Sequence, residues 1–434
     1  MRKSWKVKRY VLRNNGKEGI TCYGQYDPGR TTWLCGIGCK VGSMHVDGGL
    51  PHLAEHLLAR DCGRYDEEEV DRLFEKYADG PEGSINVRIF RTSTFLGHQG
   101  LLYKHDMVRF FDLLVNLVRH KIITTRGILS EKAAVHQEYW FNGIDPVSET
   151  IDDLMHRTMY ETNPARNRID CEPDMLLRVT PGKIRSFIRK YYVPKNMFVL
   201  ILGPRVQEAI EIAENYFGDW LVDKDKNGPE TKLDESEKFL ALNAPRHTEV
   251  VRPGIVQSHL AIGFPTGPYM SNDREALMVL ARIWAWRVRR RLRDDNQNFE
   301  EGVYRALAYT PSSFLHGMIY LWYASKSLEF VKRSEAVVLE EVERLKKDFV
   351  SGKELDAITY SLYAQHYSVF RDSPSSLAEL VIEAVCNGDE KLVRLHDFGR
   401  RVRKLSAKKL RAVANRYFTK DYARVLIRPP SNGS

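Results

Sequence analysis

Two histidines and a glutamate lie close together in the stretch GGLPHLAEHLLAR, at His52, Glu55 and His56. Residues three and four apart share one face of a helix, so these side chains can point toward one ion. Pro51 suits the first turn of such a helix, directly after a flexible Gly-Gly pair. Histidine nitrogens bind zinc, and a nearby carboxylate can take a proton from a zinc-bound water. The order H-x-x-E-H therefore predicts a catalytic metal site, and a partly exposed polar helix is the alternative.

A catalytic zinc takes three protein ligands and a water, so this stretch leaves the metal one ligand short. The segment GILSEKAAVHQEYWFNG offers candidates. Glu131 and Glu138 are seven residues apart and therefore lie on one helical face, two turns from each other. One carboxylate could bind the metal while the other hydrogen-bonds a ligand or the water. His136 is a competing ligand, and a solvated acidic face is the alternative use of the two glutamates.

The elements that must position these side chains are strands followed by helices. The strand-like runs are WKVKRYVLRN, GITCYGQY, TTWLCGIGCKVG and, after the helical DEEEVDRLFEKYA, GSINVRIFRTSTFLG. Two or more helices are expected over 107–159. In the helix that carries the two glutamates, Ser130 is the expected cap and Gly143 the expected end. This order predicts an α+β sandwich, in which a mostly antiparallel sheet packs against helices.

The chain repeats one element near the end of each half. TPGKIRSFIRKYYVPKNMFVLILGP begins at Thr180, and SAKKLRAVANRYFTKDYARVLIRPP begins at Ser406. Each copy has the pattern of an amphipathic helix, a short break and an apolar strand ended by proline. We therefore predict two homologous domains, 1–222 and 240–434, joined by a polar, charged linker at 223–239.

Composition and cysteine usage restrict the class of protein. Of the 434 residues, 43% are hydrophobic and 28% charged, which is typical of a globular protein. No apolar run approaches the ~18 residues that span a bilayer, and the basic start lacks the apolar stretch of a secretory signal, so we expect no membrane association. Six cysteines without a C-x-x-C pair indicate reduced thiols and a cytoplasmic location. Cys35 and Cys39 are expected in a buried strand.

The net charge of +9 is modest for this length, and one dense basic cluster occurs, WRVRRRLRDD at 286–295. Its five arginines fall around a helix, where solvated charge or pairing with acidic neighbours is the simplest use. Attraction of acidic peptides is an alternative. We expect no nucleic-acid partner, because no aromatic stacking strand or known binding motif accompanies the cluster.

Taken together, these motifs resemble the pitrilysin-type zinc peptidases, the inverzincin family of insulin-degrading enzyme and the mitochondrial processing peptidase. The chain resembles a small two-domain bacterial-type member. The family carries H-x-x-E-H and, farther along, a helix with E-x6-E. YVLRNNGKEGITCY resembles its opening strand, YYVPKNMFVLILG the end of its first domain, and SHLAIGFPTGP the start of its second. The resemblance implies that His52, His56 and Glu138 bind one zinc ion per chain, that Glu55 is the general base, and that Glu131 supports the site.

The resemblance also implies substrate-binding residues. SINVRIFRTSTF is similar to the family's N-A-x-T strand, with Asn86 at the sheet edge where a substrate strand would add. RRRLRDDNQNFEEGVYRALAY is similar to the segment in which the family carries an arginine and a tyrosine that bind substrate and steady the tetrahedral intermediate. Arg293 and Tyr304 are the best matches. They lie four residues farther apart than in the family, and Tyr309 is a weaker alternative.

The function predicted from the sequence is that of a zinc-dependent endopeptidase acting on peptides or unfolded protein segments. In the family, the site lies inside a closed chamber of four such domains. A two-domain chain would supply half of it, which predicts a homodimer or a heterodimer with a related chain. The alternative is a non-catalytic or half-site subunit that needs a sister chain for activity.

Overall fold

A computed structural model describes the chain over nine ranges: 6–14, 16–46, 49–76, 85–100, 104–144, 147–161, 163–221, 242–294 and 301–430. The linker predicted at 223–239 lies outside the described residues. The chain forms two compact units that are interleaved in sequence. The first comprises Met1–Asn142, Asn167–Lys232 and Tyr367–His396, and the second comprises Gly143–Arg166, Leu233–His366 and Asp397–Ser434. The domain limits 1–222 and 240–434 stay a prediction.

The first unit is built on a six-stranded sheet. Its strands are β1 (Lys8–Asn14), β2 (Lys17–Tyr26), β3 (Trp33–Cys39), β4 (Ile85–Ile89), β5 (Thr94–Gly100) and β6 (Met197–Gly203). They follow the spatial order β1-β2-β6-β3-β5-β4, and within this sheet β2 and β6 alone run parallel. Every residue of β3 and β6 is buried, which explains their continuous apolar runs. The predicted α+β class with a mostly antiparallel sheet is confirmed.

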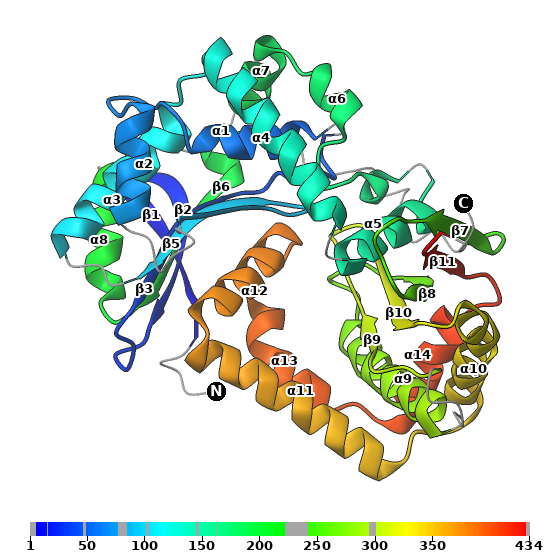
Figure 1. Cartoon of the computed structure of the whole chain (residues 1–434). Coiled ribbons are helices and arrows are strands. Elements are labelled where there is room, and N and C mark those ends of the chain that lie inside the picture. The colour runs from blue at the N-terminus through cyan, green and yellow to red at the C-terminus, as the bar shows by residue number, and fades with distance from the viewer. Residues whose placement is uncertain are drawn as a thin grey trace. The chain divides into compact units, whose positions relative to one another are not determined.

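Helices cover both faces of the first sheet (Figure 1). They are α1 (Leu50–Leu58), α2 (Glu67–Lys76), α3 (Lys104–Arg119), α4 (Thr125–Ile144), α6 (Pro173–Leu177), α7 (Pro181–Tyr191), α8 (Val206–Phe217) and α12 (Pro374–Cys386). Successive side chains of a strand point to opposite faces. On β6, Val199 and Ile201 join the core formed with α3 and α8, whereas α12 lies against β3, β5 and β6 on the other face.

Two local predictions were wrong. GSINVRIFRTSTFLG, expected as one strand, forms a hairpin of β4 and β5, in which the Phe90 N–H donates to the Ser93 carbonyl at 2.7 Å. Polar residues between the strands supply this turn. The helix α4 begins before the expected cap Ser130, because the hydroxyl of Thr124 accepts a hydrogen bond from the Gly127 N–H at 2.9 Å.

The second unit carries a five-stranded sheet. Its strands are β7 (Arg246–Val251), β8 (Ser258–Thr266), β9 (Ala306–Tyr309), β10 (Gly317–Ser325) and β11 (Ala423–Arg428), in the order β7-β11-β8-β10-β9. The remaining helices of the chain are α5 (Val147–Met159), α9 (Arg274–Asp294), α10 (Leu328–Lys347), α11 (Gly352–Asp372), α13 (Val393–Arg403) and α14 (Ala407–Tyr417). Helices α9, α10 and α14 form the core over one face of this sheet.

The internal repeat appears in the topology of both sheets. The order β2-β6-β3-β5-β4 recurs as β7-β11-β8-β10-β9, with the parallel pair at the same place. A hydroxyl caps the repeated helix in both copies. Thr180 accepts from the Lys183 N–H at 3.3 Å, and Ser406 accepts from the Lys409 N–H at 3.2 Å. The two predicted copies are thus the same structural element in two sheets.

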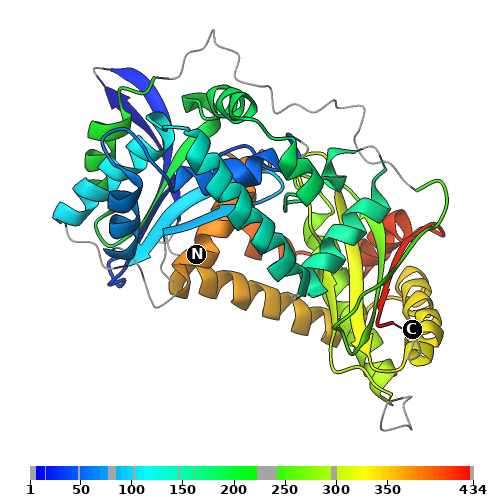
Figure 2. The ribbon, with the colours of Figure 1, turned by 45° about the horizontal axis from the view of Figure 1, so that its top comes forward.

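One helix from each half of the sequence packs on the sheet formed mainly by the other half. α5 precedes β6 in sequence but belongs to the second unit, where Asp152 accepts a hydrogen bond from the Tyr320 hydroxyl at 3.0 Å. Figure 2 shows α5 beside the strands of the second sheet. α12 occupies the corresponding place in the first unit. Each core is therefore completed by a segment distant in sequence.

Two of the five arginines in the cluster at the end of α9, Arg287 and Arg291, pair with acidic neighbours, the simplest of the uses considered for this cluster. Arg287 donates twice to Glu354, at 2.9 Å each, in a bidentate pair. Arg291 contacts Glu340 at 2.7 Å and Glu341 at 3.1 Å.

All six cysteines are free. Cys35 and Cys39 are buried in β3, as predicted. Among the described helices, none is long and apolar enough to cross a membrane.

Asp273 ties the start of α9 to α14 in the second unit. Its carboxylate is only 2% exposed and accepts from Lys409 at 2.6 Å, from Arg416 at 2.6 Å and from the Tyr417 hydroxyl at 3.2 Å. Burial alone would raise the pKa of Asp273, but these donors outweigh it and hold the pKa below its ordinary value. The buried charge is therefore compensated on several sides.

We predict that Asp273→Asn lowers the free energy of unfolding at pH 7 by about 2 kcal/mol, because it removes the charge of a buried carboxylate that accepts hydrogen bonds from two cations and a tyrosine. Since the pKa is lower in the folded chain, the carboxylate stabilises fully above about pH 4 and less as the pH falls through the folded pKa. Urea unfolding at pH 7 and pH 3 should show a smaller difference at pH 3. Asp372→Asn, in an exposed pair with Arg371, is the control and should cost less than about 1 kcal/mol. Equal effects of the two substitutions would contradict the prediction.

Candidate metal centre

The helix α1 carries three of the predicted site residues. It begins after Gly49, whose φ is +65°, and Pro51 lies in its first turn, as predicted. A Cβ on Gly49 would lie 2.2 Å from the Sγ of Cys171 and 2.5 Å from its Cα. Glycine is therefore needed both for the left-handed backbone and for the close approach of Cys171. Leucines on the opposite side of α1 are buried in the core and fix the rotation of the helix about its own axis.

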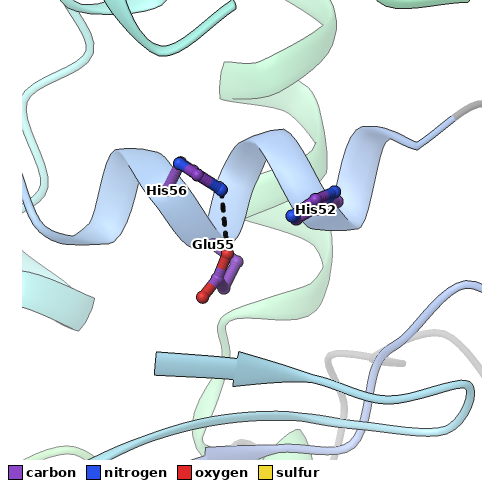
Figure 3. A group of neighbouring side chains, drawn as sticks. All are labelled: His52, Glu55 and His56. Atoms are coloured by element: carbon purple, nitrogen blue, oxygen red, sulfur yellow. Dashed lines mark ion pairs between the residues drawn. The ribbon is translucent and has the colours of Figure 1, made fainter. Parts of the chain in front are cut away.

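Figure 3 shows His52, Glu55 and His56 along α1, with the imidazole of His56 facing the carboxylate of Glu55. His52 is 4% exposed and Glu55 7% exposed, and His56 is partly buried. Their ligand atoms lie within 4.8 Å of one another. Among the described residues, this is the only group of three or more His, Cys, Asp or Glu side chains close enough to share an ion. His136, the competing ligand, is not a member of it.

The helix α4 brings both predicted glutamates to this cluster. Glu138 Oε2 lies 3.0 Å from His56 Nε2 and 3.4 Å from His52 Nε2. Glu131 Oε2 lies 3.0 Å from the other ring nitrogen of His56, Nδ1. Glu55 Oε2 is 3.7 Å from His56 Nε2. The structure thus brings together all five residues that the sequence assigned to the metal site.

The donor atoms fit a tetrahedral zinc. Zinc ligands lie at about 2.1 Å from the metal, so two of them at a tetrahedral angle are about 3.4 Å apart. The separations of 3.0 and 3.4 Å between Glu138 Oε2 and the two Nε2 atoms are close to that value. Two imidazoles and one carboxylate also match the ligand set of a catalytic zinc site, which keeps its fourth position for water.

The electrostatics of the cluster favour a positive charge where the donors converge. Burial raises the pKa of Glu55 above its ordinary value. Burial alone would lower the pKa of His56, but hydrogen bonds to Glu131 and Glu138 raise it to about 10. Hydrogen bonds to His52 and His56 hold the pKa of Glu138 well below its usual range. A divalent cation bound between these groups would compensate the negative charge of the carboxylates.

Arg60 is a residue of the site that the sequence reasoning missed. Its Nε donates to Glu131 Oε1 at 2.5 Å, and its Nη2 donates to the hydroxyl of Ser130 at 2.8 Å. Ser130, expected as a helix cap, thus serves as a partner of Arg60. The spacing of four residues from His56 was the available signal, because it places Arg60 one helical turn beyond that ligand.

The substrate-binding candidates of the second unit lie together. Arg293, in the last turn of α9, donates to the carbonyls of Val303 at 3.2 Å and Tyr304 at 3.3 Å. The Tyr304 side chain is 74% exposed, with the guanidinium of Arg293 6.0 Å from its ring centroid. Tyr309 lies on β9 and stacks on Tyr320 at 5.2 Å. Residues 295–300, which contain the extra residues between the candidates, lie outside the described part of the chain.

Asn86 lies on β4, opposite Gly97 of β5. β4 is the last strand of the first sheet and is paired, within the described sheet, with β5 alone. The side chain of Asn86 lies outside the described part of the structure.

The sequence and fold were compared with known proteins. A family model described as the peptidase M16 inactive domain matches residues 178–361. An uncharacterized zinc protease of Bacillus subtilis, YmxG, is 21% identical over 98% of this chain and 99% of its own length. The chain is related to the M16, or pitrilysin-type, peptidases. This confirms the relationship that the sequence motifs indicated.

Two further comparisons are consistent with this relationship and with the fold. The alpha subunit of the mitochondrial processing peptidase of Neurospora crassa is 22% identical over 46% of this chain and 34% of its own length. A solved structure of a Helicobacter pylori protease superposes with a TM-score of 0.84 at 20% identity, over 98% of this chain and 99% of that one. The M16 inactive-domain match starts at residue 178, so the cluster on α1 and α4 lies outside it.

The close contact of Gly49 with Cys171 yields a prediction for this chain. Gly49→Ala should cost about 1–2 kcal/mol for the left-handed backbone and a further ~1–3 kcal/mol for the clash with Cys171, and should weaken zinc binding. Gly16→Ala is the matched control, because Gly16 has φ +78° but nothing within 4 Å of its would-be Cβ. Gly16→Ala should lower the free energy of unfolding only by the cost of the left-handed backbone. Urea unfolding and zinc titration of both variants would measure this, and identical losses would contradict a steric role for Cys171.

Proposed function

We propose that the chain is a zinc-dependent endopeptidase that hydrolyses peptides or unfolded protein segments. The observation that carries this proposal is the convergence of His52 Nε2 and His56 Nε2 on Glu138 Oε2, with the buried Glu55 beside them. The relationship to M16 peptidases supports the same activity, as does the name zinc protease borne by the Bacillus subtilis relative.

In this proposal, His52, His56 and Glu138 hold one zinc ion. Zinc, when bound, polarises a scissile carbonyl and makes a water more acidic. Glu55 takes the proton of the attacking water and passes it to the leaving amine, so it ends the cycle in the state in which it began. Its position supports this role, because it is one residue from the ligand His56 and its carboxylate faces that imidazole at 3.7 Å. Glu131 orients His56 through Nδ1.

The edge strand β4 is the proposed docking position of the substrate backbone. An extended peptide can add to a sheet edge through main-chain hydrogen bonds, with little demand on its sequence. β4 lies next to α1, so a strand added there would run past the metal ligands. Asn86, Arg293 and Tyr304 are proposed as side chains that bind the substrate. The proposed substrates are therefore extended or unfolded, because a folded protein has few free strands.

A complete enzyme would require two chains. We propose a homodimer, or a heterodimer with a related chain, that closes a chamber around the site. The six free cysteines support a reducing, cytoplasmic compartment.

A second candidate function is that of a half-site subunit, which holds the metal while a sister chain supplies the arginine and tyrosine. The strongly exposed ring of Tyr304 favours it, because that ring makes no contact that fixes it apart from neighbouring arginines among the described residues. The unusual spacing between Arg293 and Tyr304 favours it as well.

Two substitutions separate the base from a ligand. Glu55→Gln should keep zinc and the fold but lower the rate of peptide cleavage by on the order of 10²–10⁴-fold, because glutamine cannot accept the proton. Glu138→Ala should instead lower zinc affinity by more than about 100-fold, since it removes a ligand rather than a supporting residue. Zinc content and cleavage of an unfolded protein substrate are measured on both variants. Normal cleavage by Glu55→Gln would exclude it as the base.

Metal content and subunit mixing separate the two candidate functions. The purified chain should contain one zinc per chain, and a chelator should abolish cleavage until zinc is restored. An active chain on its own, at the size of a dimer, supports the endopeptidase. Zinc without activity, followed by activity when a related chain is added, supports the half-site subunit. Absence of bound zinc would contradict both the endopeptidase and the half-site subunit.

A further inference from the structure

The guanidinium of Arg60 is held in the first unit by several partners. Its Nε donates to Glu131 Oε1 at 2.5 Å, and its Nη2 pairs with the same carboxylate. Nη2 also donates to the Ser130 hydroxyl at 2.8 Å, and Nη1 forms an ion pair with Glu67 of α2. Because a guanidinium has donors in a fixed planar fork, these partners define its orientation.

The carboxylate of Glu131 connects Arg60 to a metal ligand. One oxygen, Oε1, accepts from Arg60, and the other, Oε2, faces His56 Nδ1 at 3.0 Å. A carboxylate at Nδ1 keeps the proton on that nitrogen and leaves Nε2 for the metal. Arg60 stops the carboxylate from rotating away, so the chain Arg60–Glu131–His56 determines the direction of Nε2.

The other histidine ligand is held differently. His52 Nδ1 is buried and has no hydrogen-bond partner among the residues that the structure describes. Its ring is almost fully enclosed, with a side chain 5% exposed, whereas that of His56 is 20% exposed. Packing can therefore orient His52, but the more open ring of His56 depends on its polar partners.

The backbone of Arg60 is anchored without any metal. The ammonium group of Lys121 donates to the carbonyl of Arg60 at 2.6 Å and to that of Leu58 at 3.2 Å, at the end of α1. The Ile122 N–H donates to the carbonyl of Asp61 at 3.1 Å. The backbone of Arg60 is thus held by the segment after α3 through contacts that do not involve the metal.

Charge balance gives Arg60 a second role. Glu55, Glu131 and Glu138 place three formal negative charges around the site. A zinc ion would supply two positive charges, and Arg60, which Glu131 shares with Glu67, supplies a further one. Without Arg60, one buried carboxylate would lack compensation, and an uncompensated buried charge is costly.

We propose that Arg60 is a positioning residue of the metal site, acting on His56 through Glu131; this rests on the proposed zinc function. Arg60 does not touch the reacting atoms. It sets the geometry of one ligand and completes the charge balance of the site.

The test measures zinc affinity by competition with a chromophoric chelator on the full-length chain. Arg60→Met should weaken zinc binding by about 10-fold, in the range found for partners of metal ligands. Arg60→Lys, which keeps the charge but loses the planar fork, should recover part of that loss. Arg64→Met is the matched control, because Arg64 is close to Arg60 in the sequence and also forms an ion pair, with Asp112. Its side chain is exposed and has no contact with Glu131 among the described interactions. It should bind zinc as the native chain does.

A double-substitution cycle shows whether Arg60 acts through Glu131. In a Glu131→Gln background, Arg60→Met should change zinc affinity by less than about twofold, because coupled residues are not additive. A full 10-fold loss in that background would overturn the proposed route, as would native affinity in Arg60→Met alone.

The metal-free chain supplies a readout that does not depend on zinc. With labelled histidine, the Nδ1–H signal of His56, identified by its loss in Glu131→Gln, should persist in Arg64→Met and shift or broaden in Arg60→Met. An unchanged signal in Arg60→Met would overturn the proposal even if the native chain bound no zinc, an outcome that would separately refute the proposed function.

Discussion

The arrangement of the first unit depends on one contact between two helices. A single carboxylate oxygen of Glu138, on α4, faces the imidazoles of both His52 and His56, on α1. His52 and His56 lie one turn apart on α1, and Glu138 reaches both Nε2 atoms from α4. Glu131 lies about 10 Å along α4 from Glu138, which lets it contact the outer nitrogen of His56. Both contacts can form only if the two helices cross at a definite place and rotation. The buried leucines of α1, the Gly49–Cys171 contact and the Thr124 cap of α4 all serve that placement.

The same arrangement concentrates negative charge in a buried place. Burial raises the pKa of Glu55, and the neighbouring carboxylates of Glu138 and Glu131 add to this effect. Here the imidazoles and Arg60 lie between them, and the pKa values of Glu131 and Glu138 fall instead. The cluster is therefore electrostatically suited to a cation, and its two histidines differ in how they are held. One is enclosed by packing, and the other is oriented by a chain of charged groups.

The duplicated fold shows how one framework can carry two chemistries. α9 follows β8 in the second sheet as α1 follows β3 in the first. Near the start of α9, the buried acid is Asp273, and its partners are lysine, arginine and tyrosine. Its charge is already compensated by side chains, so it stabilises the unit and leaves no demand for a metal. The two units share the order of their strands. They differ in that side chains of the chain itself compensate the charge of the buried acid Asp273 in the second unit.

The sequence by itself determined the type of elements, the repeat and the residues that form the candidate metal cluster. Helical spacing places His52, Glu55 and His56 on one face, and the seven-residue spacing does the same for Glu131 and Glu138, because these are properties of a single helix. Buried strands such as β3 could be predicted for a similar reason, because a strand buried on both faces is a continuous apolar run in the sequence. The fold class was therefore predictable, although the β4–β5 turn and the first residue of α4 were not, since short polar segments serve as turn or cap equally well.

Tertiary structure alone decided what depends on contacts between distant segments. The packing of α5 and α12 on sheets formed by the other half of the chain leaves no local pattern, because any amphipathic helix can cover any apolar face. The partners of Arg60 are 7 to 71 residues away. Its spacing of four from His56 places it near that residue, but does not show that it holds Glu131. Local periodicity thus identifies which side chains could bind a metal, whereas the crossing of α1 and α4 decides which atoms of them face one another.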